Sequence, residues 1–443
     1  MLRNEQSYKY ENPFLSEDPL YSLTLCVREG ATAIALHTLL VEPDYYTRYP
    51  PLGLLKLAAL HRYQGGSVEL IRGEKPPSRR PDRVYVTSLF TYAWKPVHRA
   101  VHYYRKLFPG VPISLGGIYA SLLPDHAATS GADHVHKGLM DEAEGFMPDY
   151  DLVPQWNGSV MFASRGCIRR CGFCSVPKLE GQPSALKYSV KHLIYPGHPK
   201  TENCCNKTHH TRVILWDNNI LGNPNWRALF DELEELGMVT DFNQGLDARL
   251  VTQEVAEKIA RMRMEVVRVA YDYHGIGPFV ERAIKFLREA GVSSRKIVSY
   301  TLFNYQDDPE DFFERVRDLL NWGAVCYPMR FEPLTSLEKN RFVSPRWGRP
   351  ELEMVASARR VIGYAGAFPP YGELVKKFNR ARDFHDAFQL RERSKTKAPG
   401  FLKEQDKDIN GVEKSRMHVT RLHGGLDWRE ASTLRAEQHQ LGE

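Results

Sequence analysis

The chain has 443 residues and a formal net charge of +6; 42% of its residues are hydrophobic and 26% are charged. No run approaches the roughly 18 consecutive apolar residues of a membrane-spanning helix, so the sequence predicts no membrane span. The seven cysteines do not form the even framework of a small secreted protein, and the polar N-terminus lacks the apolar stretch of a secretory signal, which together predict a cytoplasmic protein.

The first part of the chain alternates short apolar runs with amphipathic stretches. Strands are predicted at 84–90 and 112–117, where apolar runs are bounded by Pro, Asp and Gly. Helices are predicted at 53–66 and 96–110, because apolar residues recur there every three or four positions. This alternation predicts a Rossmann-like, doubly wound parallel sheet within a domain of residues 1–155.

A second series of strands and helices follows and predicts six β/α units, the last without a clear helix. The strands are expected within 159–166, 212–220, 239–251, 265–273, 296–305 and 324–334, and the helices at 225–237, 252–262, 278–291 and 309–323. Eight units close a TIM-type barrel, so six units predict a partial (βα)6 barrel over residues 156–345, with its site at the carboxyl ends of the strands.

The C-terminal part begins with further helical patterns. Helices are predicted at 351–366 and 372–393, within a helical region of residues 346–393. The tail, residues 394–443, has no apolar periodicity and is predicted to be disordered. The predicted fold class is therefore α/β throughout the ordered chain.

Three of the cysteines lie within eight residues, in the segment GCIRRCGFCSV. Cys167, Cys171 and Cys174 have a C-x3-C-x2-C spacing in a loop directly after a predicted strand. Thiolates are ligands suited to iron–sulfur clusters, and three of them leave one iron of a four-iron cube without a protein ligand. That open iron would be free to bind a substrate, as the open position of a catalytic zinc does. The alternatives are a zinc site completed by a distant Cys or His, or three cysteines without a metal.

This segment resembles the signature of the radical S-adenosylmethionine (SAM) superfamily, C-x3-C-x-aromatic-C at the end of the first barrel strand, with Phe173 as the aromatic residue. The resemblance extends from residue 160 to about residue 334. It implies a 4Fe-4S cluster that binds SAM through its amino and carboxylate groups and cleaves it reductively to methionine and a 5′-deoxyadenosyl radical. It also implies an electron donor such as flavodoxin or ferredoxin, and a substrate that the sequence does not identify.

The resemblance and the strand ends together give a set of candidate cofactor-binding residues. Arg249 is a candidate for the SAM carboxylate, because its planar fork suits bidentate pairing, and Asp272 is a candidate for the ribose hydroxyls. Pairing of Asp247 with Arg249 at a surface turn is the competing interpretation. The full set of candidates is Phe173, Asp217, Asn219, Gln244, Arg249 and Asp272.

Two other groups of polar residues have open roles. Arg330 and Glu332, at the end of the sixth predicted strand, either face the substrate or form a buried ion pair. The segment 201–211 contains Cys204, Cys205, His209 and His210, whose adjacent pairs do not match the usual zinc spacing. An exposed loop insertion is the preferred interpretation of that segment, with a metal role as the alternative.

The N-terminal domain resembles the cobalamin-binding-type domain that precedes many radical SAM cores, through PPLGLLKLA and a GG-x-x-A-x-x-x-P turn at 116–124. Such a domain would hold cobalamin for methyl transfer, or would be an inherited lid without its cofactor. The D-x-H-x-x-G motif of some cobalamin proteins is absent from this domain. Its only literal match, at 272–277, lies in the core and is interpreted as fortuitous.

These observations give one main functional hypothesis and two alternatives. The main hypothesis is a radical SAM enzyme that modifies an unidentified substrate. The first alternative is a cobalamin-dependent radical SAM methyltransferase. The second is a noncatalytic iron–sulfur or zinc protein that binds nucleic acid, for which the diffuse positive charge is compatible but gives no support.

Overall fold

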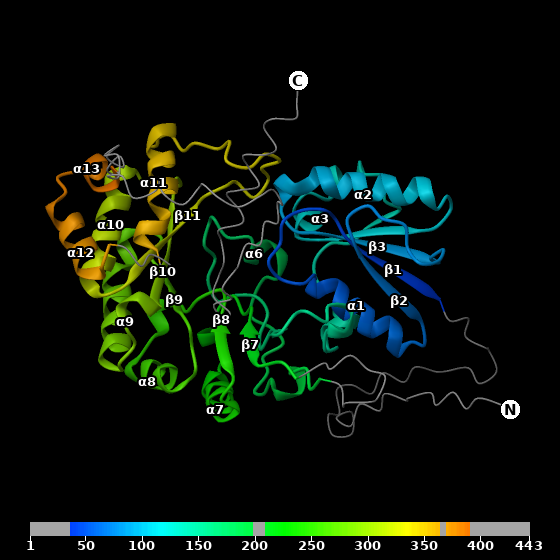
Figure 1. The fold of residues 1–443 in the computed structure, drawn as a ribbon, viewed down its shortest axis with the longest axis horizontal. Coiled ribbons are helices and arrows are strands. Elements are labelled where there is room, and N and C mark those ends of the chain that lie inside the picture. Colours follow the sequence, from blue (N-terminus) through cyan, green and yellow to red (C-terminus); the bar gives the residue numbers. More distant parts are fainter. Residues whose placement is uncertain (1–35, 198–208, 364–368, 390–443) are drawn as a thin grey trace, which may run out of the picture.

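The computed structural model describes residues 36–197, 209–363 and 369–389 and contains three parallel sheets arranged in a row (Figure 1). One sheet has five strands and two have three strands, and every ladder between the named strands is parallel. The predicted α/β class with parallel sheets is confirmed. No described helix is both long enough and apolar enough to cross a bilayer.

The N-terminal sheet has the strand order β2-β1-β3-β4-β5. The predicted strands at 84–90 and 112–117 are present as β3 and β4, whereas β1, β2 and β5 were not identified from the sequence. In β1 all six side chains are buried, so the strand has no alternation of apolar and polar residues to mark it. The strands are β1 His37–Glu42, β2 Ser67–Arg72, β3 Arg83–Ser88, β4 Ile113–Gly117 and β5 His134–Val135.

Helices cover both faces of this sheet. Leu40 of β1 packs in the cluster that includes residues of α1 (Leu52–Tyr63), whereas Leu39 and Val41 pack in the cluster that includes α2 (Trp94–Leu107). Since successive side chains of a strand point to opposite faces, α1 and α2 lie on opposite sides (Figure 1). Three short helices follow β4 and β5: α3 Ile118–Leu122, α4 Pro124–Ala128 and α5 Asp141–Glu144.

The other two sheets contain the six strands of the second series. Their orders are β6-β7-β8 and β11-β10-β9, and a parallel bridge between Leu246 and Val269 connects the end of the β8 segment to β9. The six strands therefore follow one another in chain order. They are β6 Ser159–Met161, β7 Arg212–Leu215, β8 Val239–Phe242, β9 Val267–Ala270, β10 Ile297–Phe303 and β11 Val325–Arg330.

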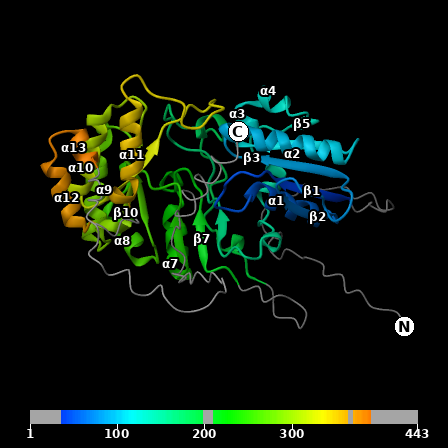
Figure 2. The same cartoon turned by 45° about the horizontal axis from the view of Figure 1, so that its top comes forward.

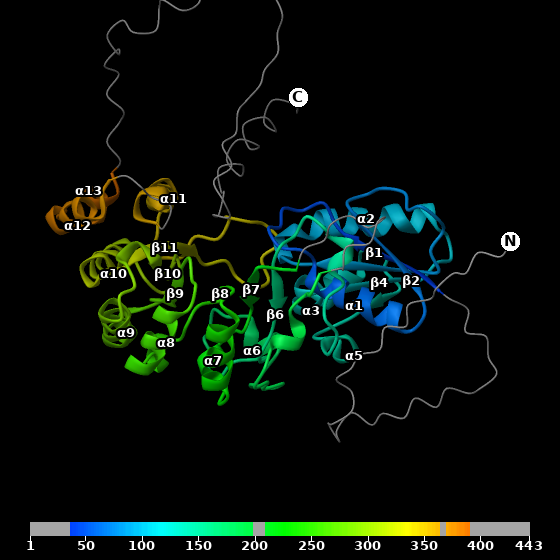
Figure 3. The ribbon, with the colours of Figure 1, turned by 60° about the horizontal axis from the view of Figure 1, so that its bottom comes forward.

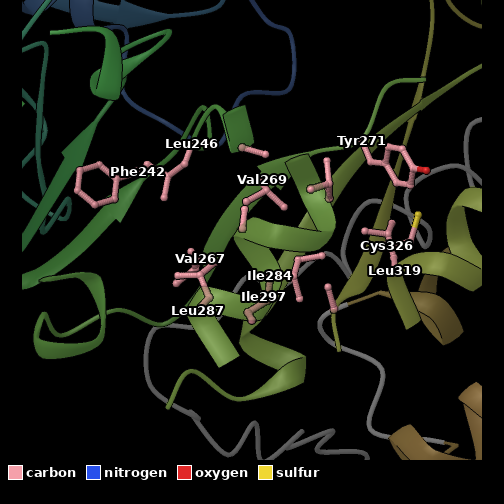
Figure 4. Close-up of a cluster of buried hydrophobic side chains, with 14 of the residues drawn as sticks. Phe242, Leu246, Val267, Val269, Tyr271, Ile284, Leu287, Ile297, Leu319 and Cys326 are labelled. Carbon is pink, nitrogen blue, oxygen red and sulfur yellow. The ribbon is translucent and has the colours of Figure 1, made fainter. Parts of the chain in front are cut away.

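Four amphipathic helices follow β7 to β10, close to their predicted positions. They are α7 Trp226–Leu236, α8 Gln253–Arg261, α9 Gly277–Glu289 and α10 Pro309–Trp322. Their apolar faces and the strands form one core, in which Val269 and Ile297 of the strands lie near Ile284 and Leu287 of α9 (Figure 4). This packing holds the strand ends, and with them the connecting loops, in fixed positions.

The C-terminal helices join the same core. α11 spans Arg349–Ile362, and the single helix predicted at 372–393 is two helices, α12 Tyr371–Arg380 and α13 Phe384–Phe388. The prediction of one helix was wrong because Asp383 begins a new one: its side chain accepts a hydrogen bond from the Asp386 amide at 2.8 Å. The end of that predicted helix and the predicted disordered tail, 394–443, lie outside the described residues.

The segment between β11 and α11 connects the two parts of the molecule. It runs from β11 towards the N-terminal sheet, in yellow in Figures 2 and 3. The Thr91 hydroxyl donates a hydrogen bond of 2.6 Å to the Ser336 carbonyl, and Leu337 packs against the N-terminal core. The loop that follows β3 is thereby held beside the segment that follows β11.

Candidate functional site

The cysteine loop leaves the end of β6 and is closed by its own backbone. Arg165 and Ser184 exchange two amide–carbonyl hydrogen bonds of 3.0 Å, and the Cys167 amide donates to the Gly181 carbonyl at 3.2 Å. Gly166 has a φ of +73°, and a Cβ atom there would overlap the Gln182 carbonyl. Glycine at this position therefore allows the loop to close directly before its first cysteine.

Two carboxylates hold the start of the loop. The buried Arg165 guanidinium donates to Glu144 of α5 at 2.8 and 2.9 Å, lies 3.3 Å from the centre of the Phe162 ring, and contacts Glu180 at 3.4 Å. Glu180 also accepts a hydrogen bond from the Gly166 amide at 2.8 Å. The N-terminal part of the molecule thus takes part in positioning the cysteines.

Glu144 pairs with two cationic side chains, Arg165 and Lys56. The buried Lys56 ammonium lies 3.2 Å from the same carboxylate. Burial opposes ionisation of Glu144, but Arg165 and Lys56 together lower its pKa. Burial lowers the pKa of Lys56 to about 8, against the opposing effect of Glu144.

Asp217, a predicted site residue, is directed at the backbone of the loop. Its carboxylate accepts hydrogen bonds from the amides of Ala163 and Ser164, at 3.0 and 2.6 Å, and from the Ser164 hydroxyl at 2.7 Å. Burial raises its pKa. Asp217, which follows β7, therefore holds the end of the neighbouring strand β6 in place.

The three thiols are half-buried. Burial raises the pKa of Cys171 and Cys174, Asp272 and the other loop thiols raise it further, and Arg249 opposes the rise at Cys171. The Arg169 amide donates to the sulfur of Cys167 at 3.3 Å, and the Val176 amide donates to that of Cys174 at 3.5 Å. Amide donors of this kind stabilise thiolate sulfur.

Three cysteine thiols in one loop offer soft ligands for an iron–sulfur cluster. In a four-iron cube each thiolate binds a different iron, so three thiolates leave the fourth iron without a protein ligand. The described residues contain no group of three or more His, Cys, Asp or Glu side chains placed to hold one metal ion.

Asp247 joins three elements at the side of this loop. Its Oδ2 accepts from Arg169 Nε at 2.8 Å and from Asn219 Nδ2 at 3.1 Å, and its Oδ1 accepts from Arg249 Nε at 2.6 Å and from the Arg249 amide at 3.2 Å. Burial opposes ionisation, but these donors lower the pKa of Asp247. The predicted pairing of Asp247 with Arg249 therefore exists, and it extends to the cysteine loop.

The other predicted cofactor-binding residues have different surroundings. Asn219 is buried, and no described residue donates a hydrogen bond to its Oδ1, which can therefore accept one from a ligand. Asp272 is half-buried, its charge raises the pKa of Cys171 and Cys174, and burial raises its own pKa to about 6. Phe173 packs edge-on against Tyr305 at 5.8 Å between ring centres. Gln244 is exposed, and its amide contacts the neighbouring Asn243 at 3.3 Å.

Arg330 and Glu332 contact each other and the segment that follows them. Their side chains lie 3.8 Å apart, Arg330 donates to the Phe342 carbonyl at 2.8 Å, and Glu332 accepts from the Asn340 amide at 2.7 Å. This arrangement favours the predicted ion pair and fixes the return of the chain after β11.

The predicted insertion is described only at its end. Cys204 and Cys205 lie outside the described residues, and His209 is exposed. His210 is buried, its Nδ1 is 2.9 Å from the Ser159 hydroxyl, and burial lowers its pKa to about 4. His210 therefore belongs to the packing beneath β6, where it also contacts Tyr195.

A small cleft of about 100 Å³ opens at the opposite, amino ends of β7 to β9. Its lining includes Arg48, Tyr49, Arg212 and Glu265 and none of the three cysteines. The titratable and thiol groups that interact with one another at the carboxyl ends of the strands make the cysteine loop the better candidate site.

Sequence reasoning missed Glu144, Glu180 and the contact of Arg169 with Asp247. Nothing in the sequence relates Glu144 to a loop some 20 residues later, because the contact depends on how the two parts pack. Arg169 had one available signal, its position between two of the cysteines.

Comparisons with known proteins give a limited result. No protein-family model matches the chain, and no curated protein matches it. Two solved structures of the radical SAM methyltransferase TsrM from Kitasatospora setae are similar at 14% identity. One, with cobalamin and a 4Fe-4S cluster bound, has a TM-score of 0.49 over 67% of this chain and 75% of that chain. The other, with tryptophan substrate and the SAM analogue aza-SAM bound, has a TM-score of 0.48 over 67% of this chain and 73% of that chain.

Proposed function

We propose that the chain is a radical SAM enzyme whose cluster is held by Cys167, Cys171 and Cys174. The observation that carries the proposal is the place of these thiols: one closed loop after the first of six parallel strands, at the carboxyl end where such a fold has its site. We interpret the six strands as a partial (βα)6 barrel over 156–345 and the preceding sheet as a Rossmann-like domain.

When bound, a 4Fe-4S cluster would supply the electron that splits a carbon–sulfur bond of SAM and yields a radical able to abstract hydrogen. The chain's residues would orient SAM at that cluster. Asn219 Oδ1, which accepts no hydrogen bond from the described residues, suits the SAM ammonium, and Arg249 suits the carboxylate. Asp272, whose charge interacts with Cys171 and Cys174, suits the ribose hydroxyls. A low-potential donor such as flavodoxin or ferredoxin would supply the electron in the reducing cytoplasm.

Anaerobic reconstitution with iron and sulfide tests the proposal. The full chain should incorporate about four irons, show the broad visible absorbance of a cluster, and convert SAM to 5′-deoxyadenosine with dithionite. Cys171→Ala should lose both properties. Cys326→Ala should keep them, because Cys326 is buried in β11 away from the loop. Stoichiometric zinc, or a cluster that never yields 5′-deoxyadenosine, would contradict the proposal.

A cobalamin-dependent methyltransferase is the second candidate. It is favoured by the all-parallel order β2-β1-β3-β4-β5, because such sheets bind their ligands at the carboxyl edge. It is also favoured by the contacts of Thr91 and Leu337, which hold this edge beside the core. Purified protein should then bind hydroxocobalamin stoichiometrically and transfer a methyl group from SAM. A protein that forms the cluster but binds no corrinoid would leave the main proposal and remove this one.

A further inference from the structure

Asp247 accepts four hydrogen bonds, two on each carboxylate oxygen. A carboxylate has about four acceptor positions, so Asp247 is saturated. Two of its donors are the Nε atoms of Arg169 and Arg249, and no further acceptor position remains for their terminal nitrogens.

The terminal nitrogens of both arginines are therefore available. Neither guanidinium makes a second ion pair within 4.0 Å or another side-chain hydrogen bond with any described residue. Their side chains are 33% and 28% exposed, so each fork can still reach a ligand. Arg169 lies between Cys167 and Cys171, and Arg249 donates to the same carboxylate as Arg169, so both guanidinium groups are next to the cysteine loop.

Two guanidinium groups share one carboxylate, so two positive charges meet one negative charge at Asp247. Among the described residues, no second carboxylate forms an ion pair with either arginine. A planar anion such as a carboxylate would match the two forks.

We propose that Arg169 and Arg249 form a two-arginine receptor for the carboxylate of SAM, oriented through their Nε atoms by Asp247. Arg249 alone already follows from the proposed function, on which this inference rests. The new element is Arg169, through which the cysteine loop would itself bind SAM. Asp247 acts through the arginines and is a positioning residue.

The test compares SAM with decarboxylated SAM, which lacks only the carboxylate. Binding of each to the reconstituted, unreduced protein is measured by calorimetry. Arg169→Gln should weaken SAM binding about tenfold to a hundredfold, the usual effect of losing a charge-assisted hydrogen bond. It should leave the affinity for decarboxylated SAM at the wild-type value, because the lost group has no partner in that ligand.

Arg170→Gln is the matched control. Arg170 is the next residue of the same loop, is exposed, and contacts Gln182 instead of Asp247. This variant should bind both ligands like the wild type. Iron content and visible absorbance, measured on every variant, confirm that the cluster is present.

Each other outcome is decisive. Unchanged SAM affinity in Arg169→Gln, with the cluster intact, overturns the inference and leaves the proposed function in place. An equal loss for both ligands also overturns it and assigns Arg169 to balancing the charge of the cluster. A wild-type protein that assembles no four-iron cluster contradicts the proposed function, and the inference with it.

Discussion

Single atoms decide whether the cysteine loop can close. Gly166 and Gly181 both have a φ near +70°. A Cβ atom at 166 would overlap the Gln182 carbonyl, whereas a Cβ atom at 181 would have no described residue within 4 Å. We expect Gly166→Ala to open the loop and to lower iron incorporation severely. Gly181→Ala should cost only the strain of the left-handed backbone, about 1 kcal/mol, and keep the cluster. Iron and sulfide content after reconstitution, with circular dichroism to verify folding, measures the difference.

Asp247 supports a second prediction at the same scale. In Asp247→Asn the amide group replaces one acceptor oxygen, so at least one of the two arginines loses its Nε partner. The variant should assemble the cluster but bind SAM about tenfold more weakly or worse. Glu232→Gln, which changes a carboxylate that holds Ser189 and Val190 outside the site, should retain wild-type affinity. Equal SAM affinities in the two variants would show that Asp247 does not orient the arginines.

At the scale of elements, α5 and the cysteine loop form one unit through Glu144 and Arg165. Glu144→Gln removes the counter-charge of the buried Lys56 and leaves the buried Arg165 only its longer contact with Glu180. We expect a loss of about 2 kcal/mol, reduced from the value for a fully buried pair by partial exposure. Glu142→Gln, an exposed change on the same helix, should be neutral. Urea unfolding of the two variants measures the loss, and equal midpoints would contradict the role of Glu144.

The elements also show which features a sequence can predict. The helices α7 to α10 were predicted within two residues at each end, because their burial follows a local period that one segment carries by itself. The predicted strands were too long, because the polar residues that follow each strand continue its sequence pattern but belong to the loops of the site. The pairing of Asp247 with Arg249, two residues further on, was predicted from the sequence. The donors at residues 169 and 219 could not be predicted, because only the assembled strands bring them to Asp247.

At the scale of the molecule, two buried histidines predict sensitivity to acid. His98 of α2 has its Nε2 2.9 Å from the Tyr119 hydroxyl, and burial lowers its pKa from 6.5 to about 4, as it does for His210. Between these values the unfolded chain binds protons that the folded chain does not. The neutral histidines therefore stabilise the folded chain fully above pH 6.5, and this stabilisation is lost as the pH falls towards 4.

From pH 6.5 to pH 5 each histidine should cost about 2 kcal/mol of unfolding free energy, at about 1.4 kcal/mol per pKa unit. Asp272 acts in the opposite direction, because its raised pKa of about 6 favours the folded chain as it takes up a proton.

A comparison of wild type with His98→Gln removes the contribution of Asp272, which both proteins share. The gap between their free energies of unfolding should change by about 2 kcal/mol between pH 7 and pH 5. Denaturant unfolding at both pH values makes the measurement, and a pH-independent gap for His98→Gln would mean that His98 is protonated in the folded protein as readily as in the unfolded chain.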